Sequence, residues 1–290
     1  MMPNLTTPVL TSQMPFQIDF ASGIVSMGSC FADEIGRRLQ ESDFHVECNP
    51  FGALYNPASM ASALRRLIED RPIDQNDLVK HEGLWHSWHH HGSFSHPTPG
   101  ATLTACNSRI HRAHQALKEA NVLMLTFGTA WVFELGGQCV VANCHKLPPD
   151  NFVRRRMAVE EIVALWQPLL QELETYYPAL NIIFSVSPIR HLADGAHGNQ
   201  LSKSTLMLAI DELITHHTSR NIFYFPSYEI VLDELRDYRY FDEKMTHPTP
   251  LAVDIVWERF QHATMPPGIR QQAHFNMKQH KQEKHIPLHQ

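Results

Sequence analysis

The sequence lacks the features that define several large classes of protein. No apolar run in its 290 residues approaches the ~20 residues that span a membrane, and its N-terminal segment has neither the basic region nor the apolar core of a signal peptide. The net charge is −6 and the lysines and arginines are dispersed, which leaves no basic field for nucleic acid. Only five cysteines occur, at irregular spacing. We therefore expect a cytoplasmic protein with free thiols that binds neither membranes nor nucleic acid.

Five short apolar runs, separated by helical patterns, indicate an α/β fold. The predicted strands are 24–27, 44–48, 122–127, 182–186 and 222–225. Three of them are continuously apolar, as expected for strands buried on both faces of a parallel sheet. The predicted helices are 31–39, 57–68, 110–120, 159–173, 202–213 and 250–260. Strands that alternate with helices imply right-handed crossovers and a doubly wound sheet.

Three segments do not fit this alternation. The glycine pair at 136–137 separates two β-like runs and predicts a hairpin that projects above the sheet. Residues 71–106 are rich in His, Pro, Gly and Ser and predict a long irregular insertion over the site. Its three histidines at 89–91 are interpreted as part of a loop rather than as a metal site. Residues 263–290 carry few apolar side chains, so we expect a polar tail with little fixed structure after a domain at 17–262.

The loop Gly28-Ser29-Cys30 is the first candidate for chemistry. Ligands of open parallel sheets bind outside the carboxyl ends of the strands, and this loop joins the first strand to a helix. Ser29 is a candidate nucleophile there, because the helix N-terminus offers N–H groups to an oxyanion, although capping the helix would be an equally good role for it. Cys30 competes as a thiol nucleophile. Its side chain is expected to turn toward the core, which favours Ser29.

The next two loops supply glycines and amides. The segment CNPFGALYNP at 48–57 follows the second strand and carries Gly52 and Asn56. TFGTAW at 126–131 places Gly128 after the third strand. A glycine allows the backbone to approach a ligand closely, and an asparagine amide is a neutral donor suited to an oxyanion hole. Ordinary turn chemistry would account for the same residues.

Later loops add a candidate base and candidate substrate contacts. His247 lies in FDEKMTHPTP, just before the last helix, where a serine esterase can hold its general base. Asn143 and His145, in the segment ANCHK, are candidates for lining a site above the sheet. Arg190 follows the fourth strand and could bind a carboxylate or phosphate of the substrate, or pair structurally with Asp194.

Several motifs in one order carry a family resemblance. GSCFA at 28–32 is followed by NPFGALYNP, TFGTAWVFE, ANCHKLP, FSVSPIRHLADG, NQLSKSTL and HPTPLAVDIVWERF. This series, over about residues 17–260, resembles the GSCFA family, a relative of the SGNH (GDSL-like) esterases. The resemblance implies an SGNH-hydrolase-like three-layer α/β/α fold with a central, mostly parallel five-stranded sheet, a hairpin and a long loop insertion. It also implies acyl-ester chemistry that needs no metal and no organic cofactor.

The resemblance assigns roles to matching positions. Ser29 takes the place of the nucleophile and His247 that of the general base. The N–H groups of Ser29, Gly52 and Gly128 take the place of the oxyanion donors. One oxyanion donor departs from the SGNH pattern. SGNH enzymes usually carry an asparagine two residues after the glycine of their third conserved motif, the glycine that Gly128 matches.

Ala130 stands at that asparagine position. GSCFA proteins tend to share this difference, so it weakens the analogy with hydrolases more than the family resemblance. The missing donor is expected from elsewhere, with Asn56 or Asn143 as candidates.

The acid that orients the histidine is the second departure. SGNH enzymes carry it three residues before the histidine, and this chain has Lys244 there. Asp242 or Glu243 would then have to orient His247 in a shifted geometry. In well-studied triads, loss of the orienting acid lowers the rate by roughly 10⁴-fold.

The sequence thus predicts a serine esterase or acyltransferase that acts through Ser29 and His247. Its substrate would be a small-molecule or carbohydrate ester, with an O-acetylated carbohydrate as one candidate. The alternative is a binding protein on an esterase-like fold that has lost turnover, and Ala130 and Lys244 motivate it. No oligomeric state is predicted.

Overall fold

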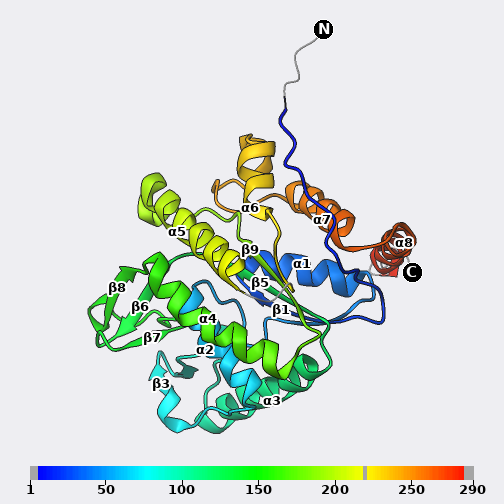
Figure 1. Cartoon of the computed structure of the whole chain (residues 1–290). Coiled ribbons are helices and arrows are strands. Elements are labelled where there is room, and N and C mark those ends of the chain that lie inside the picture. Colours follow the sequence, from blue (N-terminus) through cyan, green and yellow to red (C-terminus); the bar gives the residue numbers. More distant parts are fainter. Residues whose placement is uncertain (1–5, 218–220, 284–290) are drawn as a thin grey trace, which may run out of the picture.

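A five-stranded parallel sheet forms the centre of the protein, in a computed structural model that describes residues 6–217 and 221–283 (Figure 1). Its strands are β1 (Gly23–Gly28), β2 (His45–Cys48), β5 (Val122–Phe127), β9 (Asn181–Val186) and β10 (Ile222–Tyr224). All five predicted strands are confirmed, and every neighbouring pair runs parallel. The α/β architecture expected from alternating strands and helices is therefore the observed one.

The order of the strands determines where a ligand can bind. Across the sheet the order is β10-β9-β5-β1-β2. Strand β2 therefore lies on one side of β1, and the later strands of this sheet, β5, β9 and β10, lie on the other. Such a reversal creates a crevice outside the carboxyl ends of the two strands that flank it, here β1 and β5. Ser29 follows β1 and Gly128 follows β5, so both lie at this crevice.

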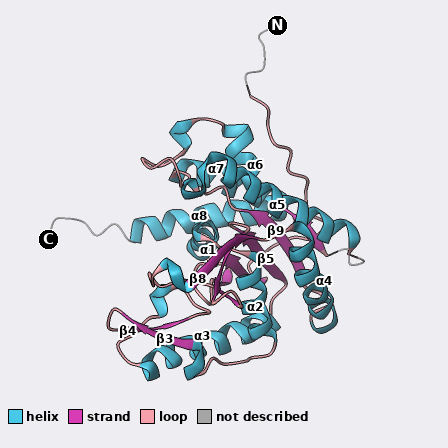
Figure 2. Cartoon of the chain, turned by 90° about the vertical axis from the view of Figure 1, so that its left-hand side faces the viewer, coloured by secondary structure: helices cyan, strands magenta, loops and turns pink. Residues whose placement is uncertain are grey.

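Helices cover both faces of the sheet, and the strands bury alternate residues against each. Val25 and Leu123 join the core beneath α2, α3, α4 and α5, whereas Ile24 and Val122 join the core beneath α1, α7 and α8. Figures 1 and 2 show these two helical layers on either side of the sheet. The longer helices are α1 (Cys30–Glu41), α2 (Pro57–Ile68), α3 (Pro99–Lys118), α4 (Val159–Tyr176), α5 (Gly195–His216), α7 (Pro250–Thr264) and α8 (Pro267–Glu283).

Two predicted helices begin earlier than expected. Helix α3 starts at Pro99, where Thr98 Oγ1 accepts a hydrogen bond from Ala101 N (3.3 Å), rather than at residue 110. Its first turns bury Thr102 and Cys106, which are too weakly apolar to show the helical period in the sequence. Helix α5 likewise starts at residue 195 instead of 202.

The predicted hairpin is confirmed, and it belongs to a larger sheet. Strands β6 (Trp131–Leu135) and β7 (Cys139–Val141) are antiparallel around the glycine pair. A third strand, β8 (Phe152–Arg156), pairs with the other edge of β6. Its sequence FVRRR is polar, so the hydrophobic pattern gave no sign of a strand.

The expectation of an irregular segment at 71–106 is wrong. It contains the hairpin β3 (Leu78–His81) and β4 (Leu84–Ser87), as well as the first turns of α3. Short turns and the small elements α6 (Ser227–Glu229), η1 (Gln75–Asp77), η2 (Gly92–Phe94), η3 (Pro149–Asn151), η4 (Leu192–Asp194), η5 (Ile230–Leu235) and η6 (Tyr238–Tyr240) complete the described chain.

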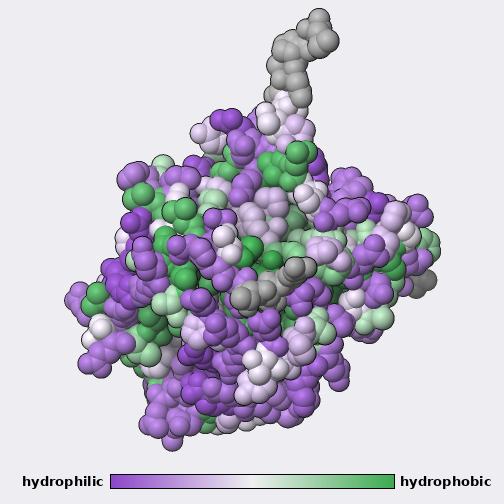
Figure 3. All heavy atoms as spheres, viewed as in Figure 1, coloured by the Kyte–Doolittle hydropathy of each residue, from purple (hydrophilic) through white to green (hydrophobic). Residues whose placement is uncertain are grey.

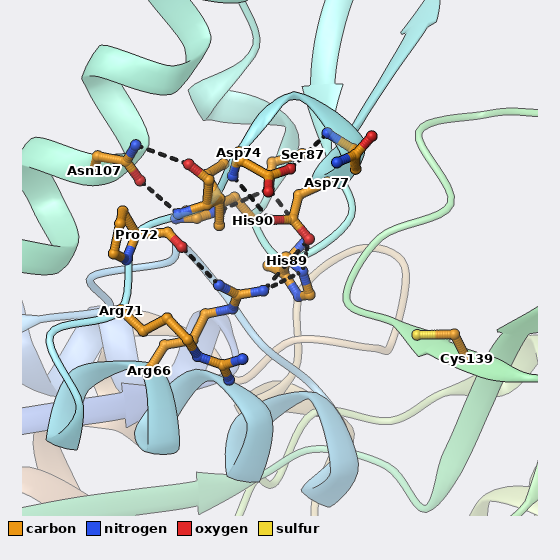
Figure 4. A network of polar contacts seen from close by, with 12 residues as sticks. Arg66, Arg71, Pro72, Asp74, Asp77, Ser87, His89, His90, Asn107 and Cys139 are labelled. Atoms are coloured by element: carbon orange, nitrogen blue, oxygen red, sulfur yellow. Dashed lines mark hydrogen bonds and ion pairs between the residues drawn. The ribbon is translucent and has the colours of Figure 1, made fainter.

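A polar network fixes this insertion to α2 (Figure 4). Arg66 of α2 donates to the carbonyl oxygen of Pro72 (3.0 Å), and its guanidinium also meets Asp77 Oδ1 (3.4 Å) and His89 Nε2 (2.8 Å). The same His89 nitrogen lies 2.9 Å from Asp77 Oδ1. His90 is completely buried beside it, with Nδ1 2.9 Å from Ser87 Oγ. His89 and His90 therefore act in packing and hydrogen bonding within the fold.

The expected unstructured tail is also wrong over most of its length. Residues 267–283 form α8, which packs on α1 and α7. Ile269, Ala273 and Met277, four residues apart, contact the core on this side. Asn276 Nδ2 also donates to the carbonyl oxygen of Ser42 (3.1 Å). Three apolar residues in a helix of 17 hardly change the polar composition of the segment, so the composition did not reveal the helix. Residues 284–290 of the predicted tail lie outside the described part of the chain.

The surface carries no sign of a large apolar interface on the face seen in Figure 3. That face is mostly hydrophilic, and its apolar side chains lie in small separate groups. Isolated exposed apolar residues are normal on proteins of this size. Within residues 6–217 and 221–283, no helix is both long and apolar enough to cross a membrane.

Burial of neutral histidine predicts acid sensitivity of the fold. Burial lowers the pKa of His90 to about 3, whereas histidine in the unfolded chain takes up a proton near pH 6.5. The unfolded state thus binds more protons below that pH, and stability is lost as the pH falls from about 6.5 toward 3. We expect urea unfolding between pH 6.5 and 4.5 to show His90 contributing a loss of about 1 kcal/mol per pH unit.

His90→Gln is the test variant, and exposed His111→Gln is its control. The His90 variant should be less stable at pH 7 but lose stability less steeply on acidification. Equal slopes for the two variants would contradict the prediction.

Candidate active site

Ser29 lies at the junction of β1 and α1, as predicted. It is the N-cap of α1, and its Oγ accepts a hydrogen bond from Phe31 N (3.3 Å). The residue is almost completely buried, yet it lines a cavity of about 710 Å³ at the carboxyl edge of the sheet. The capping role that the sequence left open is therefore confirmed, and the same residue borders a cavity in which its predicted role as a nucleophile can be tested.

Asn49 holds the turn that presents Ser29. Its Oδ1 accepts from Gly28 N (2.7 Å), and its Nδ2 donates to Asp33 in the first turn of α1. A Cβ at Gly28 would lie 2.6 Å from the carbonyl oxygen of Thr126, so only glycine fits between β1 and β5. Asn49 thus ties β1, the start of α1 and its own loop after β2 into one unit.

The loop after β5 docks on the carbonyl oxygen of Tyr55. Gly128 N and Thr129 N both donate to that oxygen, each at 2.8 Å. A Cβ at Gly128 would lie 3.0 Å from it and 3.4 Å from Ser29 Cβ, which explains the need for a small residue. The Gly128 N–H is engaged by this contact, so its predicted role as an oxyanion donor is not supported.

A buried lysine also binds the loop after β5. Lys203 of α5 is completely buried, and its Nζ donates to the carbonyl oxygens of Gly128 and Ser187, each at 2.6 Å. These two oxygens follow β5 and β9, so one ammonium joins two strand ends. Burial lowers the pKa of Lys203 to about 7. The sequence shows this residue only as a lysine within an apolar helical pattern, and its role was not predicted.

His247 also lines the cavity, and Asp242 is the carboxylate beside its ring. Its Nδ1 lies 3.5 Å from Asp242 Oδ2 and 3.0 Å from Thr246 Oγ1. Asp242 Oδ1 accepts from the backbone N–H groups of Thr246 (2.9 Å) and His247 (3.2 Å), and these bonds hold the pKa of the carboxyl below its ordinary value. The acid therefore stands five residues before the histidine. Glu243 is exposed and forms no ion pair among the described residues.

Ser29 and His247 face the same cavity but are not joined. Both residues line it, and the hydrogen bonds among the described residues include none between Ser29 Oγ and the His247 ring. His247 Nε2 likewise has no protein partner in the described chain. Catalytic hydrogen bonds are often long in proteins without substrate and shorten in the complex.

Arg190 supports the histidine loop from inside the cavity wall. Its NH1 donates to the carbonyl oxygen of Met245 (3.0 Å), and its guanidinium lies 5.5 Å from the Phe241 ring centroid. Its backbone N–H donates to the carbonyl oxygen of Thr246 (2.9 Å). Asp194, the other predicted partner of Arg190, is instead paired with Arg154.

Asn56 and Asn143 are the predicted amides that reach the cavity. Asn56 Oδ1 caps α2 by accepting from Ser59 N (2.8 Å), which leaves its Nδ2 as a donor in the cavity wall. Asn143 Oδ1 accepts from His145 N (2.8 Å), and Asn143 also lines the cavity. Ala130 is buried in the apolar core, where an asparagine amide would have no access to the cavity.

Gly52 and His145 lie outside the cavity. Gly52 has a positive φ of 74°, donates its N–H to the carbonyl oxygen of Asn49 (2.8 Å) and packs against His91. His145 is buried, stacks on His86 and meets the carbonyl oxygen of Ser87 through Nε2 (2.8 Å). Burial lowers its pKa to about 4. The structure thus gives both residues a place in packing rather than in the site.

The structure also bears on two expectations about the surroundings. Cys30 packs against the core on the α1 side, as expected, but it is only partly buried and also lines the cavity beside Ser29, with its Sγ 3.4 Å from Tyr55 Oη. The insertion at 71–106 does not cover the cavity, because none of its residues lines it. It supports the cavity wall from behind, where Trp88 O accepts from Ala142 N (2.8 Å). The wall itself is built by the β6-β7-β8 sheet.

The described residues contain no cluster of three or more His, Cys, Asp or Glu side chains that could hold a metal ion. The chemistry that the cavity can perform with its own groups is nucleophilic attack by a hydroxyl or thiol. The cavity also contains a histidine, His247, with the Asp242 carboxylate beside its Nδ1, and the other ring nitrogen of such a pair can accept a proton.

Comparisons with known proteins give one family and several distant structures. The family described as GSCFA matches residues 23–260, and no curated protein matches the chain. A protein of Parabacteroides merdae described as a GDSL-like lipase is similar at 11% identity and a TM-score of 0.43, over 87% of this chain and 98% of that one. A carbohydrate esterase of family 3 from Talaromyces cellulolyticus is similar at 6% identity and a TM-score of 0.41, over 88% and 99%.

Removal of the Asn49 amide should loosen the Ser29 turn. Asn49→Ala leaves the buried Gly28 N–H without its acceptor, so we expect a loss of about 1–3 kcal/mol in the free energy of unfolding. Chemical denaturation measures this loss. Asn76→Ala, at an exposed position, is the matched control and should change stability little. Equal effects of the two substitutions would contradict the role of Asn49.

Proposed function

The chain belongs to the GSCFA family, and we propose that it is a serine-dependent ester hydrolase or acyltransferase. The observation that carries the proposal is the placement of two groups around one cavity. Ser29 stands at the N-terminus of α1, and His247 faces the same space with Asp242 behind its Nδ1. A carboxylate on one ring nitrogen leaves the other to act as the base.

The proposed reaction begins with attack of Ser29 Oγ on the ester carbonyl carbon. The hydroxyl proton passes to His247 Nε2, and Asp242 stabilises the imidazolium that forms. The C–O bond to the alcohol then breaks, and His247 returns the proton to the departing oxygen. Water or a second alcohol attacks the acyl-enzyme by the reverse sequence, releasing an acid or a new ester and restoring Ser29.

Two donors are proposed for the oxyanion of the tetrahedral intermediate. The N–H of Ser29 lies at the positive end of α1, and Asn56 Nδ2 stands in the cavity wall. The N–H groups of Gly52 and Gly128, which the family pattern suggested, are engaged by backbone carbonyls. Asn56 would thus supply the amide that Ala130 lacks.

The proposed substrate class is a small-molecule or carbohydrate ester, with an O-acetylated carbohydrate as one member. A cytoplasmic location is part of the proposal, and the five free cysteines support it. The alternative function is a ligand-binding protein without turnover. It draws on Lys244, at the usual position of the acid, and on the absence of a Ser29–His247 hydrogen bond among the described residues.

Turnover of p-nitrophenyl acetate tests the nucleophile. We expect Ser29→Ala to reduce it to the background rate, because Ser29 is the proposed nucleophile and its hydroxyl lies at the N-terminus of α1 in the cavity that His247 also lines. A fluorophosphonate probe should label Ser29 in the wild type and in Cys30→Ala. Labelling at Cys30 by iodoacetamide with parallel loss of activity would instead identify a thiol enzyme, and no turnover in any variant would favour the binding protein.

Two neighbouring acids provide a matched test of the orienting group. Asp242→Asn should lower kcat by up to about 10⁴-fold with little change in KM, because the neutral amide no longer stabilises the imidazolium. Glu243→Gln is the control and should leave kcat near the wild-type value, since Glu243 is exposed and unpaired among the described residues. Steady-state kinetics at pH 7–8 measures both. A larger loss in the Glu243 variant would show that the wrong acid has been chosen.

A further inference from the structure

The cavity beside Ser29 is walled mainly by apolar side chains. Trp131 and Phe133 of β6, Val141 of β7 and Phe152 of β8 contribute from the small antiparallel sheet, and Leu192 contributes from the opposite side. Phe133 and Leu192 are each more than a third exposed, 36% and 37%. Large apolar side chains that border an open cavity on two sides are typical of a binding site for an apolar group.

The charged groups of the cavity already have partners. Arg154 pairs with Asp194 and stacks 4.2 Å above the Trp131 ring, and Arg190 is engaged by Met245 O. Burial lowers the pKa of His191 to about 4, so this ring is neutral near pH 7. Arg154 is thus neutralised by Asp194, and Arg190 is tied through NH1 to the histidine loop, so the apolar side chains dominate the described wall and suit an apolar part of a ligand.

The size of the cavity exceeds the need of an acetyl group. Its volume of about 710 Å³ lies within the ~300–1,000 Å³ of sites that enclose drug-sized ligands. Because Ser29 lines the same cavity, an acyl group bonded to Ser29 Oγ would have the apolar wall directly beside it.

We propose that this cavity binds the acyl chain of the substrate, and that the substrate is an ester of a medium-length apolar acid rather than an acetate. The proposal deepens the esterase function proposed above and rests on it. The acyl chain lies between the β6-β7-β8 sheet and the loop at 189–194. The alcohol leaves through the solvent-exposed side, where His247 stands.

Binding without turnover is the first test. Ser29→Ala protein is titrated with ethyl acetate, ethyl butyrate, ethyl hexanoate and ethyl octanoate, and Kd is followed by ligand-observed NMR. Each added methylene should tighten binding by about fourfold, the factor that corresponds to burial of one CH₂ group, until the cavity is filled. Equal Kd values for acetate and hexanoate would overturn the proposal.

Ala142, which directly follows β7, and Val153 of β8 give a matched pair of variants. Ala142→Phe adds a phenyl ring at the cavity wall, whereas Val153→Phe adds one on β8 at a position that is 51% exposed and does not line the cavity. The first should weaken hexanoate and octanoate binding at least tenfold and leave acetate binding unchanged. The second should leave the whole series unchanged. Equal behaviour of the two variants would overturn the proposal.

Leu192→Asp is a second test of the cavity, in case the Ala142 variant does not fold. Leu192 is partly exposed, so a carboxylate there is tolerated by the fold while it repels an apolar chain. Long-chain binding should weaken in this variant as well, with thermal unfolding near that of the wild type. Unchanged long-chain binding in this folded variant would contradict the proposed site.

The outcomes separate this inference from the esterase function. Wild-type protein that hydrolyses p-nitrophenyl acetate but shows no gain in kcat/KM up to the octanoate keeps the esterase function and overturns the acyl site. Chain-length-dependent binding without hydrolysis of any ester supports the acyl site and rejects turnover. A rise in kcat/KM with chain length that Ala142→Phe abolishes supports both.

Discussion

The loop after β2 is the part of the molecule on which the site depends. Its Asn49 Oδ1 accepts from the N–H of Gly28, its Leu54 N donates to the carbonyl oxygen of Gly28, and its Tyr55 oxygen accepts from the N–H groups of Gly128 and Thr129. Three strand ends are thereby held together by backbone groups whose positions are determined by the sheet. Such a frame is pre-organised, because its groups need no rearrangement when a substrate binds. The candidate catalytic side chains are placed on this frame, and the apolar cores on both faces of the sheet keep it fixed.

The central fold could be predicted because its signals are strong and local. Apolar runs such as VLMLTF in β5 and IIFSV in β9 have few alternatives to a buried strand, and the helices between them show a clear period. Elements that depend on tertiary contact were missed. Strand β8 is mostly arginine and exists because β6 offers it an edge, and α8 is stabilised by a single apolar stripe on α1 and α7. Neither has enough apolar residues of its own to be recognised from the sequence.

The loops that meet at the cavity could be predicted from the sequence, but the contacts of individual atoms could not. Strand order places Ser29 and Gly128 at one crevice, and the late histidine reaches it from the loop before α7. The glycine N–H groups were assigned wrongly because a sequence cannot show which carbonyl a donor meets, here those of Asn49 and Tyr55. The choice of Asp242 over Glu243 likewise depends on the turn that brings Thr246 N onto the Asp242 carboxylate. The role of Lys203 had no signal beyond a charge on an apolar helix face.

Lys203 has a consequence for how this protein can change in evolution. Its ammonium polarises the Gly128 carbonyl, the same peptide unit donates through Thr129 N to the Tyr55 carbonyl, and that peptide unit continues into Asn56. Hydrogen bonds in such a chain strengthen one another, so the energies of its members are not independent. A substitution at position 203 is therefore felt at the amide in the cavity wall, although the lysine never meets the substrate. The residues at positions 55, 128 and 203 are thus physically coupled through one chain of hydrogen bonds, so the effect of a substitution at one of them depends on the other two.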